Sequence, residues 1–146
     1  MTQQEKYNKR SKDNIAALHP DFGVRVQQWL DECRRQGLNP LIYMGARTVS
    51  VQQHLRDLFE AGKGPLAATP QKSYHCYSRA VDWVNIKAAN GKDSDLEWTN
   101  RNAYKKGILI AEGFNLHSIG DVDLPHLQDG NFASWRDLPP GEWLNS

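Results

Sequence analysis

Residues 73–82 read Ser73-Tyr74-His75-Cys76-Tyr77-Ser78-Arg79-Ala80-Val81-Asp82, which places a histidine and a carboxylate within one short stretch. Residues 80–86 alternate and are rich in β-formers, so they predict a strand. On one regular strand, side chains at an odd offset such as 75 and 82 point to opposite faces of the sheet. A turn must therefore separate the two residues, and we expect His75 in a loop and Asp82 on the strand.

A second chemistry-bearing stretch, residues 121–128, reads Asp121-Val122-Asp123-Leu124-Pro125-His126-Leu127-Gln128. Proline cannot donate to a sheet ladder, so a strand is expected to begin near Pro125. A catalytic zinc site has three N or O ligands and one open position, and His75, Asp82 and His126 would make such a set. The spacing is not that of a helical HExxH motif. Spacing alone leaves a second interpretation open, in which both histidines are ordinary hydrogen-bonded residues and Asp82 is a turn or capping residue.

The composition is that of an ordinary globular domain, with 146 residues, 39% hydrophobic and 24% charged. With 18 basic and 17 acidic residues the net charge is +1, which gives no argument for nucleic acid or an anionic membrane as a partner. The polar N-terminus has no apolar signal segment, and no run approaches a membrane span of ~20 residues. We expect synthesis in a host cytoplasm without a signal peptide, and no stable membrane insertion. We expect Cys33 and Cys76 to be buried free thiols rather than a disulfide, although a disulfide between them stays open.

The apolar periodicity predicts an α+β fold in a single domain spanning residues 1–146, with residues 1–10 left open as a flexible segment. Long connections often form functional rims, so the Gly- and Pro-rich loop 63–73 is expected at a site. The tail from residue 130 should be irregular and packed by its aromatic side chains. Helices are expected over residues 11–18, 21–33 and 49–59, and from residue 94 or 95 to 111. A small antiparallel sheet is expected from residues 41–44, 80–86, 114–116 and 124–127.

The two stretches together give S-x-H-x-x-x-x-A-x-D followed by D-x-P-H, a pattern that resembles the M15 zinc metallopeptidases. This family includes D-Ala-D-Ala carboxypeptidases, D-Ala-D-Ala dipeptidases and the L-alanyl-D-glutamate endopeptidases of phage endolysins. Residues 14–20 resemble the family's opening helix, and residues 45–48 with Gln52 and Leu55 resemble its G-x-R-[ST]…Q…L segment. Two departures are visible. Ser78 stands where the family usually has glycine, and no Gly-Gly-Asp-Trp type segment precedes the last motif.

The resemblance implies one Zn²⁺ ion held by His75, Asp82 and His126. It implies that Asp123 is the general base that takes a proton from the attacking water. Asp121 is a rival for that role, but the family's base lies three residues before the histidine, which favours Asp123.

The resemblance also implies a task for residues outside the two stretches. Arg47 matches the arginine that steadies the substrate carbonyl or the developing oxyanion. Ser73 and Gln52 match positions near the substrate.

By the same resemblance, we expect a monomeric zinc peptidase that hydrolyses an amide of the peptidoglycan stem peptide. The most specific expectation is an L-alanyl-D-glutamate endopeptidase acting as a phage-type endolysin, which reaches the cell wall after the membrane has been permeabilised. The alternatives are a D,D-carboxypeptidase or dipeptidase of the same family and, in another class, a non-catalytic peptidoglycan-binding module.

Overall fold

A computed structural model describes residues 1–145; Ser146, the last residue of the expected domain, lies outside the described part. Within these residues one sheet has four antiparallel strands in the order β1-β2-β4-β3. The strands are β1 Pro40–Met44, β2 Ala80–Asn85, β3 Leu116–Ser118 and β4 His126–Asp129. The α-helices of the described chain are α1 Gln3–Ala16, α2 Pro20–Arg35, α3 Val49–Glu60 and α4 Arg101–Glu112. The predicted α+β fold with a small antiparallel sheet is confirmed.

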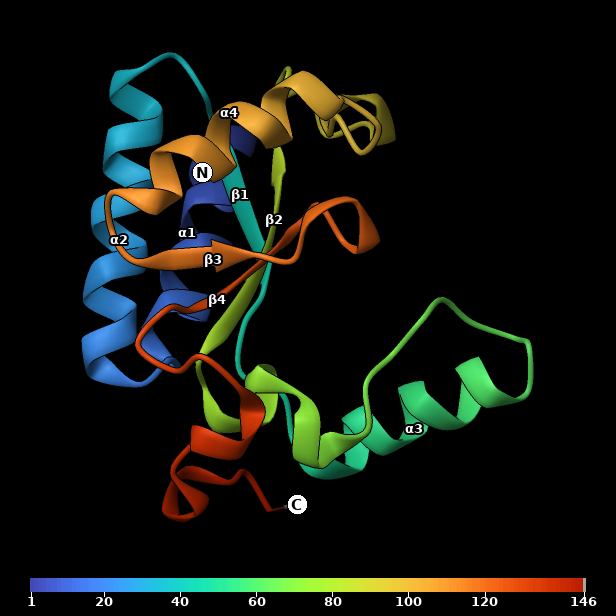
Figure 1. Cartoon of the computed structure of the whole chain (residues 1–146). Helices are drawn as coiled ribbons and strands as arrows, with labels where there is room; N and C mark the ends of the chain where they lie inside the picture. Colours follow the sequence, from blue (N-terminus) through green and yellow to red (C-terminus); the bar gives the residue numbers. More distant parts are fainter. Residues whose placement is uncertain (146) are drawn as a thin grey trace.

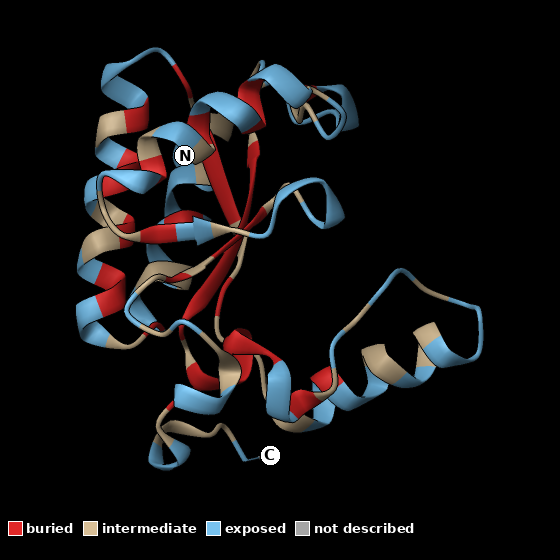
Figure 2. Ribbon diagram, viewed as in Figure 1, coloured by how far each residue is buried: buried red, intermediate tan, exposed pale blue. Residues whose placement is uncertain are grey.

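Three helices cover one side of the sheet, and the fourth stands apart from it. Figure 1 shows α1, α2 and α4 grouped beside the strands, whereas α3 projects from the other side. The buried residues concentrate where the grouped helices meet the sheet (Figure 2). Trp83 of β2 lies at the centre of this core, with its ring edge-on to Trp29 at 5.1 Å and to Tyr104 at 5.2 Å. In the part of the chain that is described, none of the helices has the length and apolar character needed to cross a membrane.

Helix α1 begins earlier than the sequence predicted. Thr2 caps the helix in a reciprocal capping box with Glu5, so residues 3–10 are helical. Ser11, where the helix was expected to begin, and Asn14 lie inside the helix and serve the edge strand β1. The Ile42 N–H donates to Ser11 Oγ (2.9 Å), and Asn14 Nδ2 donates to the Ile42 carbonyl (2.8 Å). These polar side chains satisfy backbone groups of an unpaired sheet edge, which local sequence could not reveal.

Helix α4 begins later than predicted, because Asp95 is committed to the preceding loop. Its carboxylate accepts hydrogen bonds from the backbone N–H groups of residues 90–92 and from the Tyr7 hydroxyl (2.8 Å). The cap of α4 is Asn100, whose side chain accepts from the Ala103 N–H (3.1 Å). Strands β3 and β4 likewise begin two residues later than the sequence indicated.

The C-terminal tail is irregular, as predicted, and contains two short 3₁₀ turns, Trp135–Asp137 and Pro140–Glu142. Its aromatic residues pack against a second core cluster that contains Cys76. Cys33 belongs to the main core, and both cysteines are buried free thiols.

Candidate metal centre

The strand register brings the second and third candidate ligands together. Asp82 of β2 lies directly opposite His126 of β4 in the antiparallel pairing. His75 lies in the one-turn 3₁₀ helix Tyr74–Tyr77 that precedes β2. The turn between them is made by Ser78, whose φ of 59° is in the left-handed region. The predicted loop-then-strand arrangement is confirmed, and the turn keeps the conformation that glycine favours while carrying a serine side chain.

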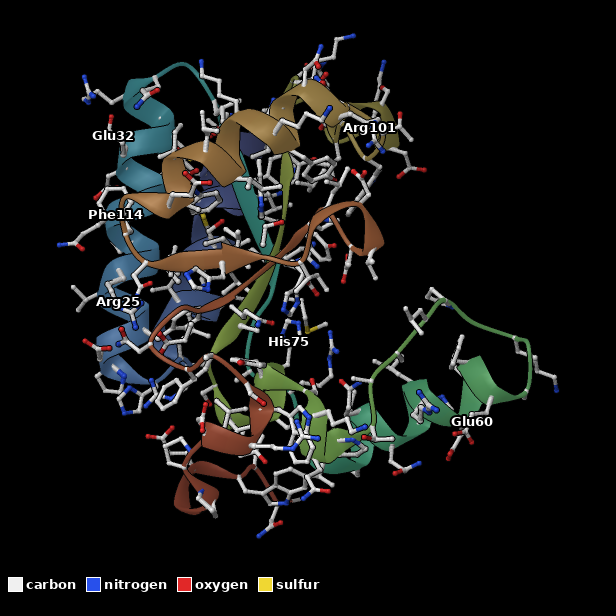
Figure 3. All side chains as sticks on the ribbon, in the orientation of Figure 1. Arg25, Glu32, Glu60, His75, Arg101 and Phe114 are labelled. Carbon is white, nitrogen blue, oxygen red and sulfur yellow. The ribbon has the colours of Figure 1, made fainter. Side chains whose placement is uncertain are left out.

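The three side chains converge on one point. One ligand atom from each of His75, Asp82 and His126 lies within 4.8 Å of the others, and all three residues are buried. His75 Nε2 is 3.4 Å from Asp82 Oδ2, and His126 Nδ1 is 3.5 Å from Asp82 Oδ1. The two imidazole rings are 5.1 Å apart and nearly perpendicular. Figure 3 places His75 between the sheet and α3.

The remaining ring nitrogens are each held by an acceptor. His75 Nδ1 lies 2.8 Å from the Gly45 carbonyl, and His126 Nε2 lies 2.9 Å from Gln128 Oε1. In the neutral imidazoles that metal binding requires, the nitrogens facing these acceptors carry the proton, which leaves Nε2 of His75 and Nδ1 of His126 with lone pairs for a metal. The sequence interpretation did not assign these supporting roles. Gln128 could have been found, because residues two apart on a strand share a face. Gly45 belongs to the G-x-R-[ST] segment, but no local signal marks its carbonyl as the partner of His75.

The residues fit Zn²⁺. Two imidazoles and a carboxylate are a common donor set for this ion, and bond lengths of 2.0–2.2 Å place tetrahedral ligands about 3.3–3.6 Å apart. Each Asp82 oxygen lies within this range of one imidazole nitrogen, Oδ2 at 3.4 Å from His75 Nε2 and Oδ1 at 3.5 Å from His126 Nδ1. Asp82 Oδ1 is buried and has no hydrogen-bond partner among the described residues. A buried carboxylate oxygen without a donor is costly, and a cation would satisfy it.

The electrostatics of the triad favour a charged carboxylate. Burial alone would raise the pKa of Asp82, but His75 and His126 beside it hold that pKa below its usual value. Burial alone would lower the pKa of His126, and the Asp82 carboxylate reverses this, so the pKa of His126 is raised.

A cavity of about 520 Å³ opens onto the triad. Helix α3 and the loop residues 64–68 line one side of it, and Ile119, Val122 and Asp123 line it from the loop between β3 and β4. The predicted rim function of the 63–73 loop agrees with this position. The cavity is large enough to hold a short peptide segment, since small-molecule sites begin at about 300 Å³.

Arg47, Gln52 and Ser73 also line this cavity. Arg47 Nη2 is 3.6 Å from Asp82 Oδ2, and its Nη1 donates to Gln52 Oε1 at 2.7 Å. Ser73 Oγ donates to the same amide oxygen (3.3 Å), while Gln52 Nε2 donates to the Ala68 carbonyl (2.8 Å). Gln52 is only 2% exposed, so in this structure it ties Arg47 to the loop. The substrate-binding role of Gln52 and Ser73 stays a prediction.

The two candidate bases occupy different surroundings. Asp123 lines the cavity, where partial burial of its carboxylate and the neighbouring Asp82 raise the pKa of Asp123 above its usual value. Asp121 is 75% exposed in its side chain and pairs with Arg101 at 2.6 Å. The geometry therefore favours Asp123 for chemistry inside the cavity, and its role as base stays a prediction.

The chain is similar to solved structures, while no protein-family model and no curated protein matches it. The L-Ala D-Glu endopeptidase ChiX of Serratia marcescens aligns with a TM-score of 0.61 and 23% identity, over 89% of this chain and 90% of that one. The vancomycin resistance D,D-pentapeptidase VanY (E175A mutant, VanB-type cassette, in complex with Zn(II)) aligns with a TM-score of 0.57 and 20% identity, over 77% and 72%. The chain therefore has the fold that these two peptidases share, as the resemblance to the M15 metallopeptidases implied, and it carries a buried His-Asp-His triad within that fold.

Proposed function

We propose that this protein is a zinc-dependent peptidase that hydrolyses an amide of the peptidoglycan stem peptide. The observation that carries the proposal is the buried triad of His75, Asp82 and His126, whose tautomers are set for metal binding and which faces a peptide-sized cavity. The shared fold supports it, because one similar structure is an L-Ala D-Glu endopeptidase and the other a D,D-pentapeptidase in complex with Zn(II).

The cavity residues divide the chemistry among them. His75, Asp82 and His126 would hold Zn²⁺, which would supply a Lewis acid for the substrate carbonyl and lower the pKa of a bound water. Asp123 lines the cavity and accepts the proton of the attacking water as general base. Arg47 is fixed by Gln52, and its positive charge stabilises the oxyanion that develops on the substrate carbonyl.

The bond that we favour is the one between L-Ala and D-Glu. The alignment with ChiX spans nearly all of both chains, whereas the alignment with VanY leaves out about a quarter of each. As a further part of the proposal, the protein acts as a monomeric, phage-type endolysin that reaches the wall after the membrane is permeabilised. This part rests on the resemblance of its motifs to the M15 family, which includes the phage endolysins. The likeness to VanY supports a second candidate, a D,D-carboxypeptidase or dipeptidase.

Digestion of purified peptidoglycan by the zinc-loaded protein, followed by mass spectrometry of the products, tests the proposal. Products with a new N-terminal D-Glu are expected, and Asp123→Ala should lower the rate by about 10²–10⁴-fold. Asp121→Ala is the matched control and should cleave like the wild type. Release of free D-Ala would move the protein to the second candidate. Absence of any cleavage would contradict the proposed enzymatic function and would favour the alternative of a non-catalytic peptidoglycan-binding module.

A further inference from the structure

The cavity is lined by more cationic than anionic side chains. Arg47, Arg56 and Lys72 line it, against the carboxylates of Asp82 and Asp123, which leaves an excess of one positive charge. A divalent metal at the triad would add two further positive charges. A cleft with one dominant sign of charge attracts ligands of the opposite sign. Hydrolysis of an amide does not require a negatively charged substrate. The lining of this cavity nevertheless favours a peptide that carries negative charge.

The guanidinium of Arg56 is fixed by several contacts, as is favourable for an arginine that binds a ligand. It comes from α3, where its Nε donates to Glu60 Oε1 (2.8 Å) and its Nη1 donates to the Ala67 carbonyl (3.0 Å). Its guanidinium also lies over the Phe59 ring, 5.2 Å from the centroid. Among the described residues, Nη2 donates no hydrogen bond, so this nitrogen has donors left for a ligand. A guanidinium fixed in this way loses little entropy when it binds a carboxylate.

Lys72 provides a second cation from another element, the 3₁₀ turn Pro70–Lys72 that leads into Ser73. Its Nζ lies 5.7 Å from the centre of the Trp135 ring. Within residues 1–145 it forms no ion pair, although it lines the cavity. An ammonium group without a counter-ion beside a substrate cavity can pair with an anionic substrate at a low desolvation cost.

We propose that Arg56 and Lys72 form a carboxylate subsite, which selects stem peptides that carry a free α-carboxylate on the glutamate over peptides in which it is amidated. The inference rests on the proposed function, since it names the feature that the same cavity recognises. Neither residue belongs to the metal-binding motifs. Arg47 is not part of the subsite, because it lies beside Asp82 at the triad and is assigned to the oxyanion.

The test compares two synthetic peptides, L-Ala-γ-D-Glu-L-Lys and its α-amidated form, L-Ala-γ-D-isoglutaminyl-L-Lys. Their Kd values are measured by calorimetry on the zinc-loaded Asp123→Ala protein, and their kcat/KM values on the zinc-loaded wild type. We expect a preference for the carboxylate form of about 10- to 100-fold, the value of one or two charge-assisted hydrogen bonds. Lys72→Met and Arg56→Gln should each reduce this preference several-fold, and rising salt should also weaken it.

Two controls separate the subsite from general effects. Lys63→Met removes an exposed lysine from the same loop and should leave the preference unchanged. Arg56→Lys keeps the positive charge and should retain most of the preference. This outcome would show that the effect of Arg56→Gln comes from the lost charge and not from the lost hydrogen bond to the Ala67 carbonyl. Equal Kd values for the two peptides would overturn the subsite. Selective binding of the carboxylate form without hydrolysis by the wild type would support the subsite and contradict the proposed function.

Discussion

A single amide decides which nitrogen of His126 can bind a metal. Gln128 Oε1 accepts from His126 Nε2, and this leaves Nδ1 facing Asp82. Such supporting contacts are worth about 10–100-fold in metal affinity. We therefore expect Gln128→Leu to weaken zinc binding by about that factor, as measured by competition with a chelator. Gln128→Glu keeps an acceptor at the same place and should bind zinc at least as tightly as the wild type. Equal affinity of the leucine variant would show that the tautomer is set elsewhere.

Two carboxylates of the site have opposite pKa shifts, which predicts opposite effects on the stability of the metal-free protein. The pKa of Asp123 is raised by partial burial and by Asp82, so its charge destabilises the folded state at neutral pH. Asp123→Asn should therefore stabilise the metal-free protein at pH 7. The gain should be less than about 1 kcal/mol, because the residue is exposed at the rim and screened by solvent.

The sign of this effect depends on pH in a defined way. A carboxyl whose folded pKa is raised costs nothing below its unfolded pKa of about 3.9, and the cost appears as the pH rises through the folded value. The gain from Asp123→Asn should therefore be absent near pH 3 and present at pH 7. Asp82, whose pKa is lowered, should behave in the opposite way, so Asp82→Asn should destabilise the metal-free protein at pH 7. Urea unfolding at both pH values checks this, and stabilisation by both variants would contradict it.

At the scale of elements, a glycine in the middle of α4 allows this helix to pack closely against the sheet. A Cβ atom on Gly107 would lie 2.4 Å from the ring of Trp83, and the Gly107 carbonyl accepts from Trp29 Nε1 at 2.9 Å. Helix propensity alone would make alanine better by about 1 kcal/mol. Overpacking of a core costs about 1–3 kcal/mol, so we expect Gly107→Ala to be destabilising overall in urea unfolding. Gly113→Ala, where the nearest atom is at 3.5 Å, is the control and should be close to neutral; an equal effect at both glycines would argue against the clash.

Elements with a buried face could be predicted from the sequence, whereas the starts of two helices could not. The apolar stripe of α2 and the β-rich run of β2 are local signals, because the period of each matches its structure. Ser11 and Asp95 stand where the two helices were expected to begin, since polar residues of this kind favour the start of a helix. Ser11 instead accepts from Ile42, far away in the chain, and Asp95 accepts from the preceding loop and from the distant Tyr7, so contacts outside the helices determine what they do.

At the scale of the whole molecule, the triad could be predicted from its motif, but the cavity around it could not. The pairing of Asp82 with His126 follows from a strand register that joins residues far apart in sequence. The placement of Arg47, through its bonds to Gln52 and Asp82, depends on where α3 projects. Cavity walls of this kind depend on long-range packing, which periodicity does not encode.

A buried charge network also joins distant parts of the chain. Asp129 is fully buried, and its two oxygens contact Arg25 of α2 and Arg79 before β2, each at 2.6 Å. Arg79 in turn forms a two-pronged pair with Glu142 of the tail, which lies 3.2 Å from His19. The network thus connects the first helices, the sheet and the C-terminal tail behind the metal-binding turn.

Removing the central charge should cost far more than removing an exposed one. Asp129→Asn leaves two largely buried arginines with a weaker partner, and breaking a buried pair in this way costs about 3–5 kcal/mol. Asp121→Asn removes an ion pair of the same 2.6 Å length to Arg101, but both of its side chains are more than half exposed. Such surface pairs contribute only about 0–1 kcal/mol. Because the two pairs match in length and differ in burial, the difference between their urea unfolding free energies isolates the effect of burial. Similar losses for both variants would mean that the tail and the sheet are held together by the aromatic cluster rather than by Asp129.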